Sequence, residues 1–276
     1  MDVSQATNRA ARPKAGRRRN ERAVIRTLAF DIGGTHIKAS VLDDAGDFLA
    51  DPIHTPTPRP AVPQAVMKVI HEQARSLAPF VRVSAGFPGA VQQGRVLTAP
   101  NLGSAAWHGF DLARALTVQL GKPARVLNDA DVQGLGTIDG MGFECVLTLG
   151  TGIGSAFFLD GRLLPHLELG QHPLHGGKTY DGYLGVRALK AKGVKAWNRR
   201  LRRTIDIVRT FTNFDILHLG GGNARLIDFD LPAGVRIGSN RAGIVGGVKL
   251  WDARLRDIFP GEAHAGKDGR GKHNRA

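Results

Sequence analysis

The chain has a single cysteine, Cys145, so no disulfide can form within it. No apolar run approaches the roughly 18–20 residues that a membrane helix needs. The basic N-terminus has no apolar stretch behind it, so a secretory signal is not expected either. A chain without disulfides depends on a buried core, and a hydrophobic content of 42% can supply one. Together these absences predict a cytoplasmic protein that does not bind membranes.

Acidic residues are also scarce. There are 24 Asp and Glu residues against 38 Lys and Arg, which gives a formal net charge of +14. Such a balance is typical of proteins with polyanionic partners: nucleic acid, an acidic membrane or a highly charged substrate. The basic residues concentrate before residue 27 and between Arg187 and Arg209, where Asp206 is the only acid. Residues 1–26 and 258–276 are polar, so we expect both to be disordered.

One pattern of apolar runs and glycines occurs twice along the chain. Each half should contain a strand, a glycine-rich turn, two further strands, a helical region and a buried strand. In the first half we expect these elements at 27–31, 37–42, 48–50, 62–77 and 80–87, followed by a helix at 112–120. In the second half we expect them at 145–149, 155–159, 162–167, 183–211 and 216–219, followed by a helix that begins near Arg241. Glycine after a strand is common in any α/β protein, but the matched order favours an α/β protein duplicated into two lobes around one cleft.

Each half places a glycine-rich turn directly after its first strand. The first turn is Gly33-Gly34-Thr35, with Asp31 before it and Lys38 after it. The second turn contains Gly150, Thr151, Gly152 and Gly154. Because glycine has no Cβ and can adopt positive φ, backbone N–H groups in such turns can approach an anion closely. Both turns are therefore predicted to bind phosphate, and Asp31 to hold Mg²⁺ directly or through water.

An Asn128-Asp129 pair follows the strand-like segment 124–127. A carboxylate at the carboxyl end of a strand is well placed to accept a proton from a hydroxyl group in a cleft. Asn and Asp are also preferred N-caps, and a helix is expected to begin near Asp131. The local sequence alone leaves both interpretations of Asp129 open.

Other polar residues have simpler interpretations. Glu168, His172 and His175 lie close together in sequence, but no cysteine pair or HExxH motif supports a metal site. Gly177-Lys178-Thr179 is not the end of a P-loop, because His172 occupies the position of the first required glycine. His218 lies in an apolar strand and is expected to be a core residue with a hydrogen-bond partner.

A series of motifs runs in order between about Leu28 and Asp252. They are LAFDIGGTHIK, GFPGAVQQGRVLTAPNLG, LNDADVQGLG, LTLGTGIGSAFFLDG, LELGQ, LHLGGGNAR and NRAGIVGGVKLW. With these motifs the chain resembles the ROK family of sugar kinases, most closely its polyphosphate glucokinase branch. The resemblance implies an actin/hexokinase-like (ribonuclease H-like) duplicated fold. It implies an N-terminal lobe at 27–127, a C-terminal lobe at 128–240 and a closing helix at 241–257 that packs back on the N-terminal lobe.

The resemblance also implies roles for individual residues. Asp129 would be the catalytic base, and the two glycine-rich turns would hold the donor phosphates. Sugar contacts would come from Asn101, Asn128, Glu168, Gln171, His172 and Asp181. Nucleotide contacts would come from Gly220, Gly221 and Gly222.

The chain departs from the family pattern at several positions. Gln171 stands where the family has His, and His172 follows directly, so either could serve the sugar. Asp181 is the nearest acid to a second sugar-binding Glu. The cysteine-rich zinc motif of many members is absent, so no structural zinc is expected. Family repressors carry a helix-turn-helix before the kinase domain, and about 26 residues are too few for one, so nucleic acid binding is not expected.

The expected activity is phosphoryl transfer from polyphosphate, ATP or both to the 6-hydroxyl of glucose or a related hexose, in a homodimer. Arg199, Arg200, Arg202 and Arg203 are predicted to form a polyphosphate track, because a helix face of one charge sign favours a bound polyanion. The alternatives are an ATP-dependent kinase of mannose or an amino sugar, a non-catalytic sugar-sensing regulator of the same fold, and a scaffold without activity.

Overall fold

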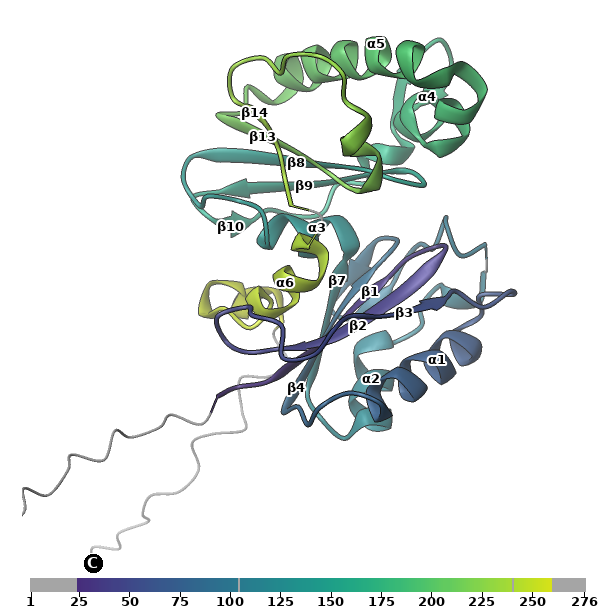
Figure 1. Cartoon of the computed structure of the whole chain (residues 1–276), viewed down its shortest axis with the longest axis vertical. Coiled ribbons are helices and arrows are strands. Elements are labelled where there is room, and N and C mark those ends of the chain that lie inside the picture. Colours follow the sequence, from purple (N-terminus) through teal and green to yellow (C-terminus); the bar gives the residue numbers. More distant parts are fainter. Residues whose placement is uncertain (1–23, 104, 240, 260–276) are drawn as a thin grey trace, which may run out of the picture.

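The computed structural model describes residues 24–103, 105–239 and 241–259. They form two lobes, each built on a five-stranded sheet (Figure 1). The predicted basic arm and C-terminal tail lie almost entirely outside these residues. Within the described ranges, no helix has both the length and the apolar character needed to cross a membrane.

The first sheet has the strand order β3-β2-β1-β4-β7. Its strands are β1 (Thr27–Ile32), β2 (His36–Leu42), β3 (Ile53–Pro56), β4 (Arg82–Phe87) and β7 (Ala124–Asn128). Successive side chains of a strand point to opposite faces. Leu28 and Phe30 therefore pack with α1 (Pro63–Arg75) and α2 (Leu112–Leu120), while Ala29 packs with α6 (Ala242–Lys249) on the other face.

The second sheet repeats this plan with the order β10-β9-β8-β13-β14. Its strands are β8 (Phe143–Leu149), β9 (Ile153–Leu159), β10 (Arg162–Leu163), β13 (Ile216–Gly220) and β14 (Val235–Ile237). β8 pairs antiparallel with β9 and parallel with β13, as β1 does with β2 and β4. Its outer face is covered by α4 (Tyr180–Leu184) and α5 (Val186–Thr212), where Trp197 and Leu201 are buried. The predicted duplication is confirmed.

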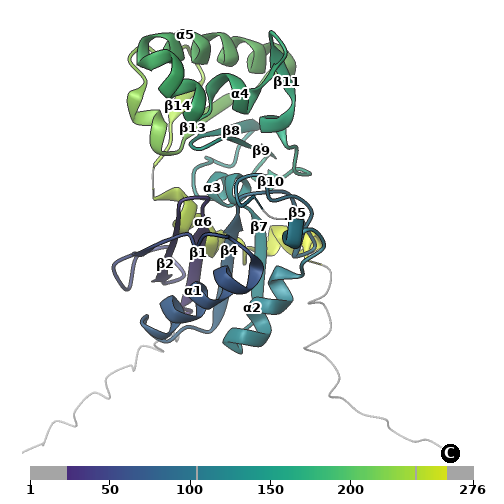
Figure 2. The ribbon, with the colours of Figure 1, turned by 90° about the vertical axis from the view of Figure 1, so that its right-hand side faces the viewer.

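Two helices fill the space between the sheets, α3 (Asp129–Leu135) and α6 (Figures 1 and 2). α3 contacts both sheets, because Val132 packs in one cluster with Leu127 of the first sheet and with Val146 and Phe158 of the second. α6 is tied to the first sheet by the Ser84 hydroxyl, which donates to the Gly247 carbonyl at 2.6 Å. The contact between the two helices is therefore the main junction of the lobes.

The remaining elements are short. Two small hairpins are β5 (Val91–Gln92) with β6 (Arg95–Val96), and β11 (Pro173–His175) with β12 (Lys178–Thr179). Single turns of 3₁₀-helix occupy Ala105–Trp107, Leu169–Gln171, Gly222–Leu226 and Ala253–Ile258. The turn at Leu169–Gln171 matters for function, because it follows Glu168 at the cleft.

Edge strands account for most of the errors in the sequence-based elements. The predicted strand at 48–50 is wrong: only a bridge between Phe48 and Leu42 forms there, and the third strand is β3. β3 ends in Pro56 and lies at the edge of the sheet, where a residue without an N–H is tolerated. β10 stops at Leu163, so the predicted strand at 162–167 is too long. β14, also at an edge, was not predicted at all.

The predicted helical region at 183–211 is broken in two places. Gly185 separates α4 from α5, and within α5 Gly193 adopts φ 74° and ψ 166°, which is not helical. Glycine accepts this positive φ without steric cost. The basic residues on α5 therefore belong to two helical pieces that meet at a kink.

The α3–α6 contact yields a first prediction, for Gly246→Ala. A methyl group at Gly246 would lie 1.8 Å from the Val132 carbonyl oxygen, so the two helices would have to separate. Overpacking of this kind costs about 1–3 kcal/mol, and we expect a fall in Tm on the order of 5 °C. Thermal unfolding measures this.

Gly182→Ala is the matched control for Gly246→Ala. A methyl group at Gly182 would lie 3.6 Å from its nearest neighbours, which is ordinary contact. Its Tm should stay within about 2 °C of wild type. Equal Tm values for the two variants would contradict a tight junction between α3 and α6.

Candidate active site

A cavity of about 130 Å³ lies between the lobes and is lined by both of them. Most of the predicted site residues reach it. They are Gly33, Gly34, Asn101, Asn128, Asp129, Gly150, Thr151, Gly152, Gly154, Glu168, Gln171 and Asp181. The two glycine-rich turns, 117 residues apart by their first glycines (150 − 33), thus line one cavity, as the duplication predicts.

Asp129 stands at the junction of β7 and α3, as the first residue of the helix. The N-cap is Asn128, whose Oδ1 accepts from the Ala130 N–H at 2.7 Å and the Asp131 N–H at 3.4 Å. Asn128 also donates through Nδ2 to the Gly89 carbonyl at 3.0 Å. Because Asn128 does the capping, the Asp129 carboxylate is left at the cavity with one local bond, from the Ala130 N–H at 2.9 Å.

The surroundings of Asp129 change its affinity for a proton. Burial, followed by the charge of Asp31, raises the pKa of Asp129 to about 7, and Glu168 and Asp131 add to this, while the Ala130 N–H opposes it. A base with a pKa close to the working pH combines a usable unprotonated fraction with a strong pull on a proton. Asp129 therefore has both the position and the basicity to accept a proton from a hydroxyl group.

Asp31 lies in register with Lys38 on the neighbouring strand, and Lys38 Nζ is 2.8 Å from Asp31 Oδ2. The described residues contain no group of three or more His, Cys, Asp or Glu side chains that could hold a metal ion. A protein site for Mg²⁺ here would consequently offer few ligands, with Asp31 as its predicted member. Lys38 and Thr35 are outside the cavity lining.

Positive φ does not explain why these two turns are rich in glycine. Neither turn contains a residue with positive φ. Close approach is the constraint instead: a methyl group would lie 3.0 Å from the Asn101 carbonyl at Gly34, and 2.7 Å from Asp181 Oδ2 at Gly152. The glycines thus let the turns pack against residues that line the cavity from other segments.

The wall opposite the first turn carries the predicted sugar contacts. Gln171 Nε2 donates to Asp181 Oδ2 at 2.9 Å, and Asp181 Oδ1 accepts from the Ile153 N–H. Burial raises the pKa of Asp181. His172 does not line the cavity, so of the two candidates at this position the geometry favours Gln171.

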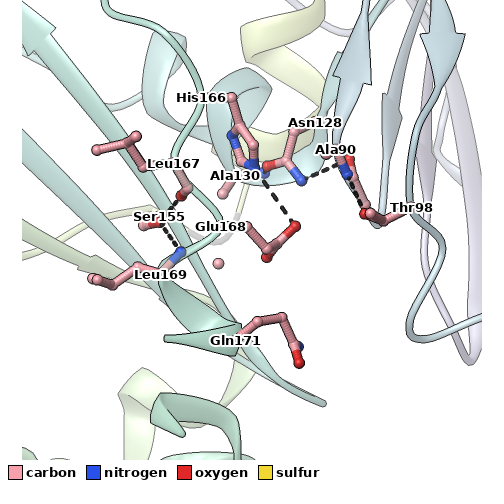
Figure 3. Close-up of polar contacts among 12 residues, drawn as sticks. Ala90, Thr98, Asn128, Ala130, Ser155, His166, Leu167, Glu168, Leu169 and Gln171 are labelled. Atoms are coloured by element: carbon pink, nitrogen blue, oxygen red, sulfur yellow. Dashed lines mark hydrogen bonds and ion pairs between the residues drawn. The ribbon is translucent and has the colours of Figure 1, made fainter. Parts of the chain in front are cut away.

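The segment that carries Glu168 is fixed from behind by one hydroxyl group. Ser155 donates to the Leu167 carbonyl at 2.7 Å and accepts from the Leu169 N–H at 3.4 Å (Figure 3). Glu168 lies between these two residues, so its backbone is held on both sides while its side chain points into the space between the lobes.

Gly220, Gly221 and Gly222 lie just outside this cavity. Gly220 ends β13 and Gly221 and Gly222 follow it. Asn223 beyond them donates through Nδ2 to the Gly150 carbonyl at 3.1 Å. Gly221 has φ 82°, and a methyl group there would lie 2.6 Å from the Leu149 carbonyl oxygen. The predicted nucleotide motif is therefore adjacent to the second phosphate turn.

The predicted polyphosphate track does not form a single face. Arg200 donates to the Tyr183 carbonyl at 3.0 Å, and Arg203 lies 3.4 Å from Nε2 of His175. Arg202 instead lies over the ring of Phe229, 4.4 Å from its centroid. Arg202 therefore projects away from Arg200, because residues two apart on a helix diverge by about 200°. The polyphosphate track through the four arginines stays a prediction.

Two residues at the site were not predicted. His166 Nδ1 lies 3.1 Å from Asp131 Oδ2, and His166 Nε2 lies 3.7 Å from Glu168 Oε2. His166 and Asp131 are 35 residues apart, so only a tertiary contact brings them together. The available signal was Asp131 inside the LNDADVQGLG motif, and it was used only to place a helix.

The ROK family profile matches residues 27–176. The chain belongs to the ROK family. A curated relative, the polyphosphate glucokinase of Mycobacterium leprae, is 31% identical over 237 residues, which cover 80% of this chain and 73% of the relative. The polyphosphate glucokinase of Mycobacterium tuberculosis (strain CDC 1551 / Oshkosh) is 32% identical over 237 residues, which cover 79% of this chain and 88% of that relative.

A solved structure of a sugar kinase also matches this chain. The inorganic polyphosphate/ATP-glucomannokinase from Arthrobacter sp. strain KM superposes with a TM-score of 0.76 at 32% identity. The match covers 82% of this chain and 97% of that one. The predicted family and the actin/hexokinase-like fold are confirmed, and these relatives are sugar kinases by name, in line with the predicted activity.

The raised pKa of Asp129 predicts how Asp129→Asn changes stability. The folded-state pKa, about 7, lies above the ordinary value of 3.8, so the folded ROK protein loses stability as pH rises through this window. Asn removes the buried charge that forms at high pH. Asp129→Asn should therefore raise Tm near pH 8 by several degrees and change it little near pH 4, as measured by thermal unfolding.

The exposed Asp206 on α5 offers the control for this effect. Asp206→Asn should leave the difference in Tm between the two pH values as in wild type. If Asp129→Asn gave the same shift at both pH values, the carboxylate would not be held in an environment that disfavours its charge.

Proposed function

We propose that this protein is a hexose kinase that transfers the terminal phosphoryl group of polyphosphate, ATP or both to the 6-hydroxyl of glucose or a closely related hexose. The observation that carries the proposal is Asp129, a carboxylate with a pKa of about 7 in a cavity lined by two glycine-rich turns. The named activities of the relatives at 31% and 32% identity support it.

In the proposed reaction Asp129 accepts the proton of the sugar hydroxyl as its oxygen attacks the terminal phosphorus. The bond between that phosphorus and the bridging oxygen breaks, and the donor leaves shortened by one phosphate. The protein forms no covalent intermediate, so its contribution is positioning and electrostatic stabilisation. The backbone N–H groups of Gly34, Thr151 and Gly152 are the proposed donors to the transferring phosphoryl group, because those of Gly33, Gly150, Ile153 and Gly154 already donate within the protein.

A divalent cation, proposed to be Mg²⁺, would neutralise charge on the donor phosphates when bound. Mg²⁺ keeps several waters and takes one or two carboxylates plus substrate phosphates, so the sparse donor set around Asp31 fits it. The charge of Asp31 adds to burial in raising the pKa of Asp129, so the two carboxylates lie near each other. Lys38 would keep Asp31 oriented through their 2.8 Å contact.

The sugar is proposed to bind against the wall formed by Asn101, Glu168, Gln171 and Asp181. Asn128 is a weaker candidate than the resemblance implies, because its Oδ1 caps α3 and its Nδ2 binds Gly89. Buried polar groups that match a hydroxyl discriminate strongly between sugars. The Arthrobacter relative is named a glucomannokinase, so mannose belongs beside glucose in the first panel of acceptors. The cytoplasmic location and the homodimer stay predictions.

Asp129→Asn tests the proposed base. Loss of general-base assistance typically costs about 10²–10⁴ in rate, so kcat should fall by that factor. In wild type, kcat/KM should rise with pH through about 7, because Asp129 must lose its proton. A coupled assay with glucose and both donors measures these effects, and glucose binding by calorimetry should persist in the variant. Retention of more than about a tenth of the activity would refute the assignment.

The donor is the second open question, and α5 bears on it. Its first residue, Val186, donates its N–H to the Thr151 carbonyl at 3.1 Å, so α5 begins at the second phosphate turn. Arg187 and Lys190 are exposed just beyond this point, and Arg199 is exposed further along. A polyphosphate chain that leaves the cavity at Thr151 would meet these cations in order, which ATP is too short to do.

Charge reversal in two sets tests this donor path. Arg187→Glu with Lys190→Glu should raise the KM for polyphosphate about tenfold or more and the KM for ATP far less, because each lost contact weakens polyanion binding. Arg199→Glu with Arg203→Glu should affect only long polyphosphate. Lys68→Glu with Arg75→Glu on α1 makes the same change in net charge on the other lobe and should affect neither donor. Equal effects of all three sets, or no turnover with polyphosphate at low salt, would contradict the path.

A further inference from the structure

A buried histidine connects the catalytic helix to the proposed sugar wall. His166 lies between Asp131, two residues after Asp129 on α3, and Glu168 at the cavity. The His166 side chain is 12% exposed and that of Asp131 is 4% exposed. In Figure 3, a dashed line joins the side chains of His166 and Glu168, which are two residues apart in the same segment. His166 itself does not line the cavity.

The position of His166 between two carboxylates favours its protonated form. Burial lowers its proton affinity, but the neighbouring Asp131 and Glu168 carboxylates outweigh burial and raise the pKa of His166 to about 10. A protonated imidazole has two N–H donors and no acceptor. Nδ1–H donates to Asp131, and Nε2–H is directed towards Glu168.

The bond between His166 and Glu168 is incomplete. His166 Nε2 and Glu168 Oε2 are two of the few buried polar side-chain atoms among the described residues that lack a hydrogen-bond partner, and they lie 3.7 Å apart. Because buried polar groups are almost always paired, we expect His166 Nε2 and Glu168 Oε2 to come within hydrogen-bond distance of each other. Closure would commit Oε2 to His166 and leave Oε1 of Glu168 for a ligand in the cavity.

We infer that His166 is a positioning residue for sugar binding: anchored by Asp131, it orients the Glu168 carboxylate and couples it to the helix that carries Asp129. The inference rests on the proposed function, because it takes Glu168 as a sugar contact. It adds a residue that acts only through Glu168. A sugar that binds to Glu168 is thereby held in a fixed relation to Asp129, since both carboxylates are tied to α3.

A second buried histidine provides the matched control. His218 Nε2 lies 2.7 Å from Oε2 of Glu144, which is fully buried and also accepts from the backbone N–H groups of residues 139–141. Neither residue lines the cavity. His218→Gln should lower Tm and leave the glucose KM unchanged, as expected for a purely structural histidine–carboxylate pair.

The test compares His166→Gln and His166→Leu with wild type and His218→Gln. Glucose affinity is measured by calorimetry without donor, together with kcat, KM for both substrates and Tm. We expect His166→Leu to raise the glucose Kd and KM about tenfold or more, with a smaller change in kcat and no change in donor KM. Gln can still donate to one partner, so His166→Gln should lose less than Leu and remains measurable if Leu fails to fold.

A double-mutant cycle with Glu168→Gln separates the inference from the proposed function. If His166 acts through Glu168, His166→Gln should have little further effect on glucose Kd in the Glu168→Gln background. Additive effects would overturn the inference while leaving Glu168 as a sugar contact. Unchanged glucose Kd in Glu168→Gln would overturn the proposed sugar wall itself, and the inference with it. A His166 variant that loses only Tm, as His218→Gln does, would make His166 structural.

Discussion

The lobes of this protein are held together where the backbones of α3 and α6 meet. Gly246 has no room for even a methyl group against the Val132 carbonyl, and Gly136 on α3 is similarly close to the Ala242 carbonyl. Side-chain packing allows small adjustments, but a contact between backbones does not. The position of α3 between the sheets is thus fixed by α6, and α3 begins with Asp129. The geometry of the proposed base is set by a helix–helix contact that involves no side chain of the cavity.

The proposed catalytic region concentrates acids inside a strongly basic chain. Asp31, Asp129, Asp131, Glu168 and Asp181 lie around or behind one cavity, although the whole chain carries a formal net charge of +14. Lys38 and His166 offset part of this negative charge by direct contact. Burial, followed by the charge of Asp31, still raises the pKa of Asp129. The proposed contacts to an anionic donor are thus exposed cations on α5, outside the cavity, and backbone N–H groups inside it.

The sequence predicted the central parts of the fold better than its edges. The strands next to each glycine-rich turn were predicted, because a buried strand is a nearly continuous apolar run. β3 was misplaced and β14 was missed, because both are short edge strands that mix polar with apolar residues. The motifs brought Glu168 and Asp129 into one site. They could not separate the roles of Asn128 and Asp129, because both are good caps and only the bonds of Asn128 identify the one that caps.

Tertiary contacts explain what the sequence could not predict at the site. His166 became visible only through Asp131, which is remote in sequence. The arginines of α5 were taken as one track because they are dense in sequence, yet Arg202 and Arg203 project to different sides and contact Phe229 and His175.

The shared strand order of the two sheets lets each position next to one glycine-rich turn be matched with a counterpart next to the other. Asp31 pairs with Lys38 next to the first turn, and the equivalent pair beside the second turn is Thr148 with Gly154. The two halves thus differ at this position: the first has a charged pair, and the second has a neutral hydroxyl that accepts from the Gly154 N–H at 3.1 Å. The two turns that line the cavity are therefore not equivalent. Exchanging them between the halves would move the Asp31–Lys38 charged pair to the other side of the cavity.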